Sequence, residues 1–457
     1  MQASRQSQFG PPSVALQVAR SKALQAVHEA HAVNPLVRWA FYLFVASIPF
    51  ETMTMGVPIE LTMITGSLLI LSTILEMRIF YRWPSGALWC FLIYLYICIV
   101  VSVLEKASYR LEVGWSLVVL TQLLLVFWIS YNLMRYHSIA RRALLIFVAA
   151  CAALAVFQVL GITARVSDAG AKVERVSAMG LNPNDLARIL VLGLLALVGL
   201  AYGQGKSALQ RYLAWPLFAV MAVTIVQTGS RGALVAMAAG LMIFVLNEGS
   251  VWSKVRNVVT ILLLVGFFVF VSFESDVARE RFERAEEEGG LARREEIYPN
   301  ALEMFLERPV MGWGVVGYTY ELGSRLGHID EQTKNAHNLI LHALASTGLL
   351  GAIPLFLGIG FSVRAAWRAR RGSQGVLPLA MIVTVLMANM SGLWLYKKLN
   401  WVVLAYALAS CSGLVAARSR RAVNMPDFSR VNGLSKRLRG AVPRGVLAAS
   451  LHSRRNA

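Results

Sequence analysis

The chain has 457 residues, of which 57% are hydrophobic and 15% are charged. A soluble domain carries about a quarter charged residues, so this composition excludes an ordinary soluble protein and predicts a polytopic membrane protein. The net charge of +19 does not indicate nucleic acid. The excess of basic residues lies beside apolar segments and in the tail after Ala416, where it marks the cytoplasmic side and attracts anionic membrane lipids.

A transmembrane helix needs about 20 apolar residues, and on that basis the sequence predicts an all-α fold with about twelve such helices. Residues 1–35 are expected to form a cytoplasmic tail without a cleavable signal peptide. Transmembrane helices 1–9 are placed in residues 36–273, a large loop in 274–337, helices 10–12 in 338–416 and a basic cytoplasmic tail in 417–457. The predicted spans are Leu36–Thr54, Pro58–Met77, Gly86–Leu104, Val113–Leu133, Arg142–Ile162, Asn184–Tyr202, Tyr212–Thr228, Arg231–Leu246, Asn257–Phe273, Asn338–Ala366, Val376–Leu395 and Leu399–Ala416.

Charge in the connections predicts the orientation. Basic residues recur in every second connection, and an even number of spans places both termini on one side, which the basic tail marks as cytoplasmic. The 274–337 loop is then extracytoplasmic, and it holds more than half of the 25 acidic residues. Lys397 and Lys398 are exceptions, because the helix count leaves these two lysines outside.

The long loop has its own predicted structure. Pro299–Glu307 can form a short helix with Leu302, Phe305 and Leu306 along one face. The following run, Gly312–Tyr318, is typical of a turn at the membrane interface, where tryptophan and tyrosine are common. The apolar segment after Asn338 is long enough that Gly348 or Pro354 is expected to break or kink it.

One histidine has the position expected of a general base. Of the seven histidines, only His328 and His337 fall at the outer surface in this topology. If Asn335 is the helix N-cap, His337 lies in the first turn, where the positive end of the helix favours a neutral ring. Asn338 beside it can orient the ring or cap the helix, and a histidine at a helix start is itself often a capping or interface residue.

Several arginines are predicted at the same membrane face. Arg231 follows a tight turn, Arg294 lies in the long loop, and Arg188 lies about a turn inside its span. An ionisable residue at that depth is a functional candidate, although Arg188 can also pair with Asp185. Guanidinium groups match phosphate oxygens in a bidentate way, so the set suits the binding of a diphosphate.

We expect neither a metal ion nor another cofactor. The predicted outer loops contain no Asp-x-Asp pair of the kind that holds Mg²⁺ at a diphosphate. The four cysteines, Cys90, Cys98, Cys151 and Cys411, all lie in apolar segments with spacings that suggest neither disulfides nor a metal site.

Short motifs in this order resemble the O-antigen ligase and polymerase superfamily of bacterial inner membranes. The resemblance covers roughly Asn182 to Ile353 and is carried by Thr228–Gly232, Arg294–Tyr298, Arg308–Gly314, Ala336–Asn338 and Gly348–Gly351. The arginine-plus-aromatic element usually has tryptophan where Tyr298 stands, so Arg293 is an alternative to Arg294.

The resemblance implies a membrane-embedded, GT-C-type glycosyltransferase of the inner membrane with a periplasmic active site. Such a ligase transfers O-antigen polysaccharide from undecaprenyl diphosphate to a sugar hydroxyl of the lipid A-core, without metal or nucleotide. The family's essential histidine and arginines correspond to His337, Arg231 and Arg294. The implied partners are these two glycolipids and the membrane lipids.

Other functions fit parts of the same pattern. An O-antigen polymerase or a protein O-oligosaccharyltransferase of this superfamily also needs a base and a diphosphate site. A lipid or solute transporter would instead place its polar groups near the middle of the membrane. The sequence favours the ligase, because the resemblance through His337 is closest there and no sizeable outer domain follows the last spans.

Overall fold

The structure is a computed structural model. It describes residues 33–51, 60–79, 85–166, 175–178, 180–201, 208–246, 294–327, 333–372 and 374–412, with a few single positions between 251 and 266. Most of Asn257–Phe273, the charged run before Arg294, His328, and nearly all of both predicted tails lie outside these residues.

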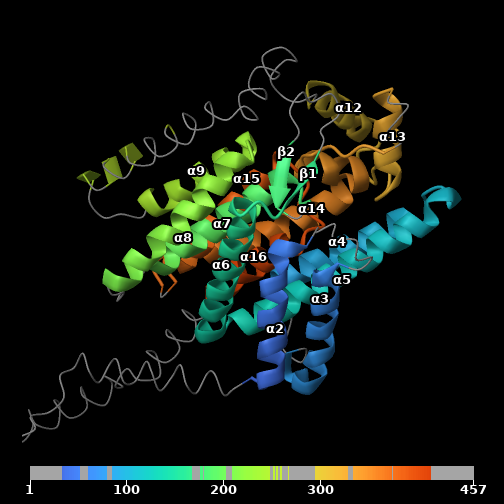
Figure 1. Cartoon of the computed structure of the whole chain (residues 1–457). Helices are drawn as coiled ribbons and strands as arrows, with labels where there is room; N and C mark the ends of the chain where they lie inside the picture. The colour runs from blue at the N-terminus through green and yellow to red at the C-terminus, as the bar shows by residue number, and fades with distance from the viewer. Residues whose placement is uncertain are drawn as a thin grey trace, which may run out of the picture. The chain divides into compact units, whose positions relative to one another are not determined.

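The described residues are almost entirely helical (Figure 1). Five helical segments are long and apolar enough to cross a membrane: Leu61–Ile79, Arg110–Met134, His137–Val159, Pro183–Ala201 and Leu339–Ala369. The helices are α2 (Pro35–Ser47), η1 (Ile48–Phe50), α3 (Leu61–Ser72), η2 (Thr73–Ile79), α4 (Gly86–Ser102), η3 (Ala107–Tyr109), α5 (Arg110–Met134), α6 (His137–Val159), α7 (Pro183–Ala201), α8 (Ala208–Gln227), α9 (Arg231–Leu246), α12 (Arg294–Glu307), α13 (Gly317–Arg325), α14 (Leu339–Ala369), α15 (Leu377–Asn389) and α16 (Lys398–Ala409).

Each predicted transmembrane segment apart from Asn257–Phe273 overlaps an apolar helix of the structure. Several of these helices are shorter than a membrane span, so the total of twelve spans stays a prediction.

The all-α prediction missed one feature. Strands β1 (Thr163–Val166) and β2 (Arg175–Ala178) form an antiparallel hairpin between α6 and α7, with Thr163 opposite Ala178. Its strands are four residues long, too short for an alternating pattern to stand out.

Helix α14 is opened at Gly348, as the sequence predicted. Gly348 has φ 60° and ψ −162°, so the helical hydrogen bonding is interrupted there. The segment before α13 occupies the interruption: the amides of Trp313 and Gly314 donate to the carbonyls of Ala345 and Ser346 at 2.8 and 2.9 Å. Glycine is needed at position 348 because a Cβ there would collide with the backbone of Val310.

Further bonds in the opposite direction complete this junction. The amides of Leu349 and Leu350 donate to the carbonyls of Pro309 and Val310 at 2.8 and 3.2 Å. Two of the motifs that carry the resemblance, Arg308–Gly314 and Gly348–Gly351, therefore have a structural role, because they fix the long loop to α14. Figure 1 shows α12 and α13 beside the first part of α14.

Helix α12 differs from the prediction in both extent and orientation. It begins at Arg294, one turn before the expected Pro299, and buries Ile297, Ala301 and Met304. Leu302 and Leu306, which the prediction placed along one face, are 46% and 67% exposed. The buried positions recur every three to four residues, and the extra turn at the start supplies Ile297, which the predicted helix lacked.

The predicted exception at Lys397–Lys398 has a structural explanation. Lys398 is buried at the start of α16, and its ammonium group lies 3.0 Å from Glu51 and 3.2 Å from Glu60. Lys397 pairs with Asp185 at 3.5 Å. Both lysines are thus held by carboxylates, so their position does not depend on the side of the membrane that attracts basic residues.

The opening of α14 predicts opposite effects for two glycines of the same helix. Gly348→Ala should lower the free energy of unfolding by about 1–3 kcal/mol, because the left-handed backbone and the Val310 contact both resist a Cβ. Gly360→Ala should raise it by about 0.5–1 kcal/mol, because a Cβ there meets nothing within 4 Å. Thermal unfolding of the purified protein measures both variants, and equal shifts would contradict the account.

Candidate active site

The candidate site is built on a turn between α15 and α16, which we call the Ser391 turn (Met390–Lys397). The side chain of Asn389 stabilises this turn: its Oδ1 accepts from the Trp394 amide at 3.0 Å, and its Nδ2 donates to Asn400 at 3.1 Å. The indole of Trp401 donates to the Leu395 carbonyl at 2.6 Å. Buried polar bonds of this kind hold the turn in a single conformation.

Two arginines from distant helices donate to one carbonyl oxygen of this turn. Arg188 of α7 reaches the Ser391 carbonyl at 2.9 Å and its hydroxyl at 3.0 Å, and Arg294 at the start of α12 reaches the same carbonyl at 2.7 Å. Gly392 has no room for a Cβ, because the Arg188 guanidinium lies against it. The sequence predicted that these arginines share one face, and the structure brings them onto a single atom.

Asp185 partly neutralises this group of cations. Its carboxylate lies 3.4 Å from Arg188 and 3.5 Å from Lys397, and it accepts the indole N–H of Trp394 at 2.9 Å. The pairing of Arg188 with Asp185, left open as an alternative, is therefore present. It does not neutralise the site, because this one carboxylate pairs with both Arg188 and Lys397, and Arg294 adds a third positive charge at the Ser391 carbonyl.

Arg231 is the first residue of α9 and lies beside the same turn. The preceding Gly229 adopts φ 62°, which directs the chain into the helix. A Cβ on Gly232 would lie 2.7 Å from the Ser391 hydroxyl and 3.9 Å from the Arg188 guanidinium. The start of α9 is thus packed against the Ser391 turn, and Arg231, Arg188 and Arg294 come from three helices that meet there.

His337 lies immediately before α14, not within its first turn as predicted. The N-cap is Asn338, whose side chain accepts from the amides of Ile340 and Leu341 at 2.9 and 3.3 Å. The expected cap, Asn335, instead accepts from Tyr318. Capping is therefore the observed role of Asn338. The prediction failed because either asparagine can cap, and only the fold selects one.

His337 adopts φ 49°, the one non-glycine residue with positive φ among the described residues. A residue other than glycine in this region carries a free-energy cost, and such residues concentrate at functional sites. The residue is exposed at the surface. The pKa of His337 is lowered below its usual 6.5. Desolvation of the ring is the largest cause, and the positive charges of Arg294, Lys334 and Arg188 lower the pKa further.

The neutral histidine predicted from the sequence is thus supported, but for a different reason. The prediction relied on the positive end of a helix, whereas the structure attributes the lowered pKa to desolvation and to neighbouring cations. Asp185 opposes the shift. A ring that stays neutral at pH 7 can accept a proton from a hydroxyl group.

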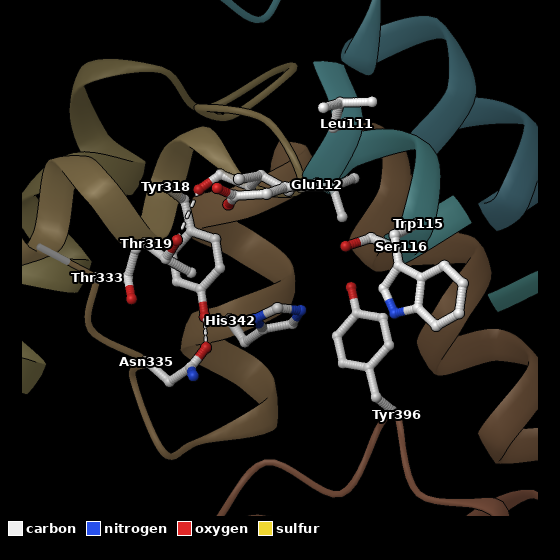
Figure 2. A pocket seen from close by; sticks show the side chains of 12 residues that line it. Leu111, Glu112, Trp115, Ser116, Tyr318, Thr319, Thr333, Asn335, His342 and Tyr396 are labelled. Carbon is white, nitrogen blue, oxygen red and sulfur yellow. Dashed lines mark hydrogen bonds between the residues drawn. The ribbon is translucent and has the colours of Figure 1, made fainter. Parts of the chain in front are cut away.

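A cavity of about 480 Å³ adjoins the segment that leads to His337. Figure 2 shows His342 between Tyr318 and Tyr396, with Asn335 nearby. His342 Nδ1 lies 2.8 Å from the Tyr318 hydroxyl, and both residues are buried. One prediction is corrected: Tyr318 is buried and is not an interface anchor. His342, which the predicted topology did not place at the outer surface, lines the cavity.

Several residues of the site carried little signal in the sequence. Asp185 and Lys397 could have been found, since one lies three residues before Arg188 and the other is a charged residue at a predicted outer helix end. Ser391 could not, because its carbonyl forms the contact and backbone atoms carry no residue-type signal.

Within the described residues no group of three or more His, Cys, Asp or Glu side chains forms a metal site. Metal independence stays a prediction.

Comparison with known families supports the resemblance. The family model described as O-antigen ligase matches residues 216–357, a range that includes Arg231, Arg294, His337 and Asn338 but not Arg188. No curated protein matches the chain. Residues 216–357 are therefore similar to the O-antigen ligase family.

The ion pair between Arg188 and Asp185 predicts that these two residues contribute jointly to stability. Arg188→Gln and Asp185→Asn should each lower the free energy of unfolding, since each leaves a partly buried charge with one partner fewer. The double variant should cost less than the sum of the two, with a coupling of about 1–3 kcal/mol. A double-mutant cycle by chemical or thermal unfolding measures this, and additive losses would show that the two groups do not interact.

Proposed function

Taking the match of residues 216–357 to the O-antigen ligase family model as the premise, we propose that this membrane protein is a GT-C-type glycosyltransferase. It transfers O-antigen polysaccharide from undecaprenyl diphosphate to a sugar hydroxyl of the lipid A-core. The reaction takes place at the periplasmic face of the bacterial inner membrane, with inversion and without a metal. The single observation that carries the proposal is the convergence of Arg188 and Arg294 on the Ser391 carbonyl, close enough to His337 to lower its pKa.

The cation cluster provides what a departing diphosphate requires. Arg294 uses one of its five N–H donors on Ser391, which leaves donors for phosphate oxygens. Arg188 is more fully engaged by Ser391 and Asp185, so it acts mainly through its fixed positive charge. Preorganised charges of this kind stabilise a developing anion without having to reorganise during the reaction. Arg231, at the start of α9, is proposed as a further phosphate ligand.

His337 is proposed as the general base. As the new glycosidic bond forms, the imidazole takes the proton of the acceptor hydroxyl, and the bond from the anomeric carbon to the diphosphate oxygen breaks. Direct displacement inverts the configuration at that carbon. Desolvation and then Arg294, one of the cations proposed to bind the diphosphate, lower the pKa of His337, so binding of the leaving group and activation of the nucleophile are linked through the same charge.

The location of the site also supports a lipid-linked substrate. The family match covers the long loop and the first half of α14, and the predicted orientation places this end of α14 at the periplasmic side. A site there is accessible to lipid-linked glycans from the outer leaflet of the inner membrane. The same features would serve a polymerase of the superfamily. Comparing the glycolipids of cells lacking the protein separates the two, because a ligase null accumulates lipid-linked polymer and keeps a bare core.

The base role predicts a specific dependence on pH. Because the pKa of His337 is lowered, the acidic limb of kcat/KM should lie below pH 6.5, with activity lost as pH falls through the folded-state pKa. Lys334→Gln removes one of the lowering charges and should move the limb to higher pH. His337→Ala should lose about 10²–10⁴-fold in turnover. Near-normal turnover in His337→Ala, or retained configuration in the product, would exclude this role.

A second prediction concerns the diphosphate. Arg294→Ala should abolish transfer, and Arg294→Lys should restore only part of it, because a point charge replaces a bidentate donor. Folding should be little affected, since the side chain is half-buried at the start of α12. Transfer measured with purified donor and acceptor gives the result, and Arg325→Ala serves as the control, since this arginine pairs with Glu307 and Glu321. Full activity of Arg294→Ala would remove it from the site.

A further inference from the structure

The cavity beside His342 is not used by the mechanism above, yet it is built from residues that recognise small polar molecules. Its volume of about 480 Å³ falls within the roughly 300–1,000 Å³ typical of ligand pockets. The lining combines aromatic rings with hydrogen-bonding groups: Glu112, Trp115, Ser116, Tyr318, Thr319 and Tyr396 are among them. Figure 2 shows Glu112, Trp115 and Ser116 of α5 on one side of the cavity and Tyr318 and Thr319 of the long loop on the other, with Tyr396 of the Ser391 turn beside them.

The two sides of the cavity are fixed to each other. The amides of Val315 and Gly317 each donate to Glu105 at 2.7 Å, which ties the start of α13 to the segment before α5. The Tyr320 hydroxyl donates to Glu112 at 2.7 Å, and its ring stacks on Tyr109 with centroids 4.4 Å apart. Such bonds keep the cavity open with a defined shape, which lowers the entropy cost of binding.

His342 presents an unused acceptor in this cavity. Burial raises the pKa of the Tyr318 hydroxyl, which keeps its proton and donates to Asn335 Oδ1 at 2.7 Å. The Tyr318 oxygen is then free to accept from Nδ1–H of His342 at 2.8 Å, so in the neutral ring the lone pair is on Nε2. That atom is buried and has no hydrogen-bond partner within the part of the chain that the structure describes.

We propose that this cavity is a saccharide subsite, in which a sugar hydroxyl donates to His342 Nε2 and the sugar ring packs on Trp115. A buried acceptor favours a ligand that brings its own donor, because an unsatisfied polar atom is costly. Sugars combine several hydroxyl donors with a face of C–H groups, which the negative face of an aromatic ring attracts. Glu112 at the rim supplies a second, stronger acceptor.

The subsite rests on the proposed glycosyl transfer and makes it more specific. Asn335, two residues before His337, lines the cavity, so a glycan held there lies next to the proposed base. Either the acceptor core or the first sugars of the donor can supply the ring. In both cases His342 is a positioning residue that accepts a hydroxyl hydrogen bond, and the proton in the reaction goes to His337.

Two variants with different risks to folding test the subsite. Trp115 is 58% exposed, so Trp115→Ala should fold normally, and Trp39→Ala in α2, at a tryptophan that is 69% exposed and does not line the cavity, is the matched control. His342→Phe removes the acceptor and keeps the volume, with thermal unfolding as a check. With the purified full chain, KM for one substrate should rise about three- to tenfold in each variant while kcat changes less. The substrate whose KM rises identifies the source of the sugar.

Direct binding separates failure of the subsite from failure of the proposed function. Saturation-transfer NMR with free core oligosaccharide, and separately with free O-antigen oligosaccharide, should show sugar protons in contact with the protein, and Trp115→Ala should weaken this signal. Binding without any transfer by the native protein would contradict the transferase and keep the subsite. Unchanged KM values together with no sugar signal, or a signal from detergent alkyl chains only, would overturn the subsite.

Discussion

The site depends on two guanidinium groups that share one carbonyl oxygen. Arg188 and Arg294 bind the oxygen of Ser391 from α7 and α12, although like charges at this separation repel each other. The carbonyl dipole and Asp185 offset part of that repulsion. What remains is a concentration of positive charge held by the fold, and an anion bound there relieves it. This is the property that a metal-free site for diphosphate requires.

The second constraint is the interruption of α14 at Gly348. Because the helix opens there, the segment before α13 can hydrogen-bond directly to its backbone. The long loop is thereby fixed to the same helix whose start presents His337 on a left-handed backbone and His342 in the neighbouring cavity. The proposed base and the proposed sugar subsite thus share one support, and a substitution at Gly348 should affect both.

Much of this could be predicted from the sequence, and the limits have physical causes. Apolar segments predicted the helices, since burial in lipid requires long apolar runs. The length of the segment after Asn338 predicted a break at Gly348 or Pro354, and the fold selects Gly348. Arg294 and His337 were predicted as site residues from short motifs, and their roles stay predictions. The N-cap at Asn338 and the buried face of α12 were missed, because both depend on tertiary packing that overrides local preference. The role of Ser391 was beyond prediction, since it acts through its backbone.

The most direct measurement is a structure of the full chain with an undecaprenyl diphosphate-linked glycan bound. The account predicts that the diphosphate lies within hydrogen-bonding distance of Arg294, over the Ser391 turn, with the anomeric carbon facing His337. Such a complex would also show whether Arg231 reaches a phosphate oxygen. A diphosphate bound elsewhere, with Arg294 still bonded only to Ser391 and His337 facing away from the glycan, would contradict the central claim.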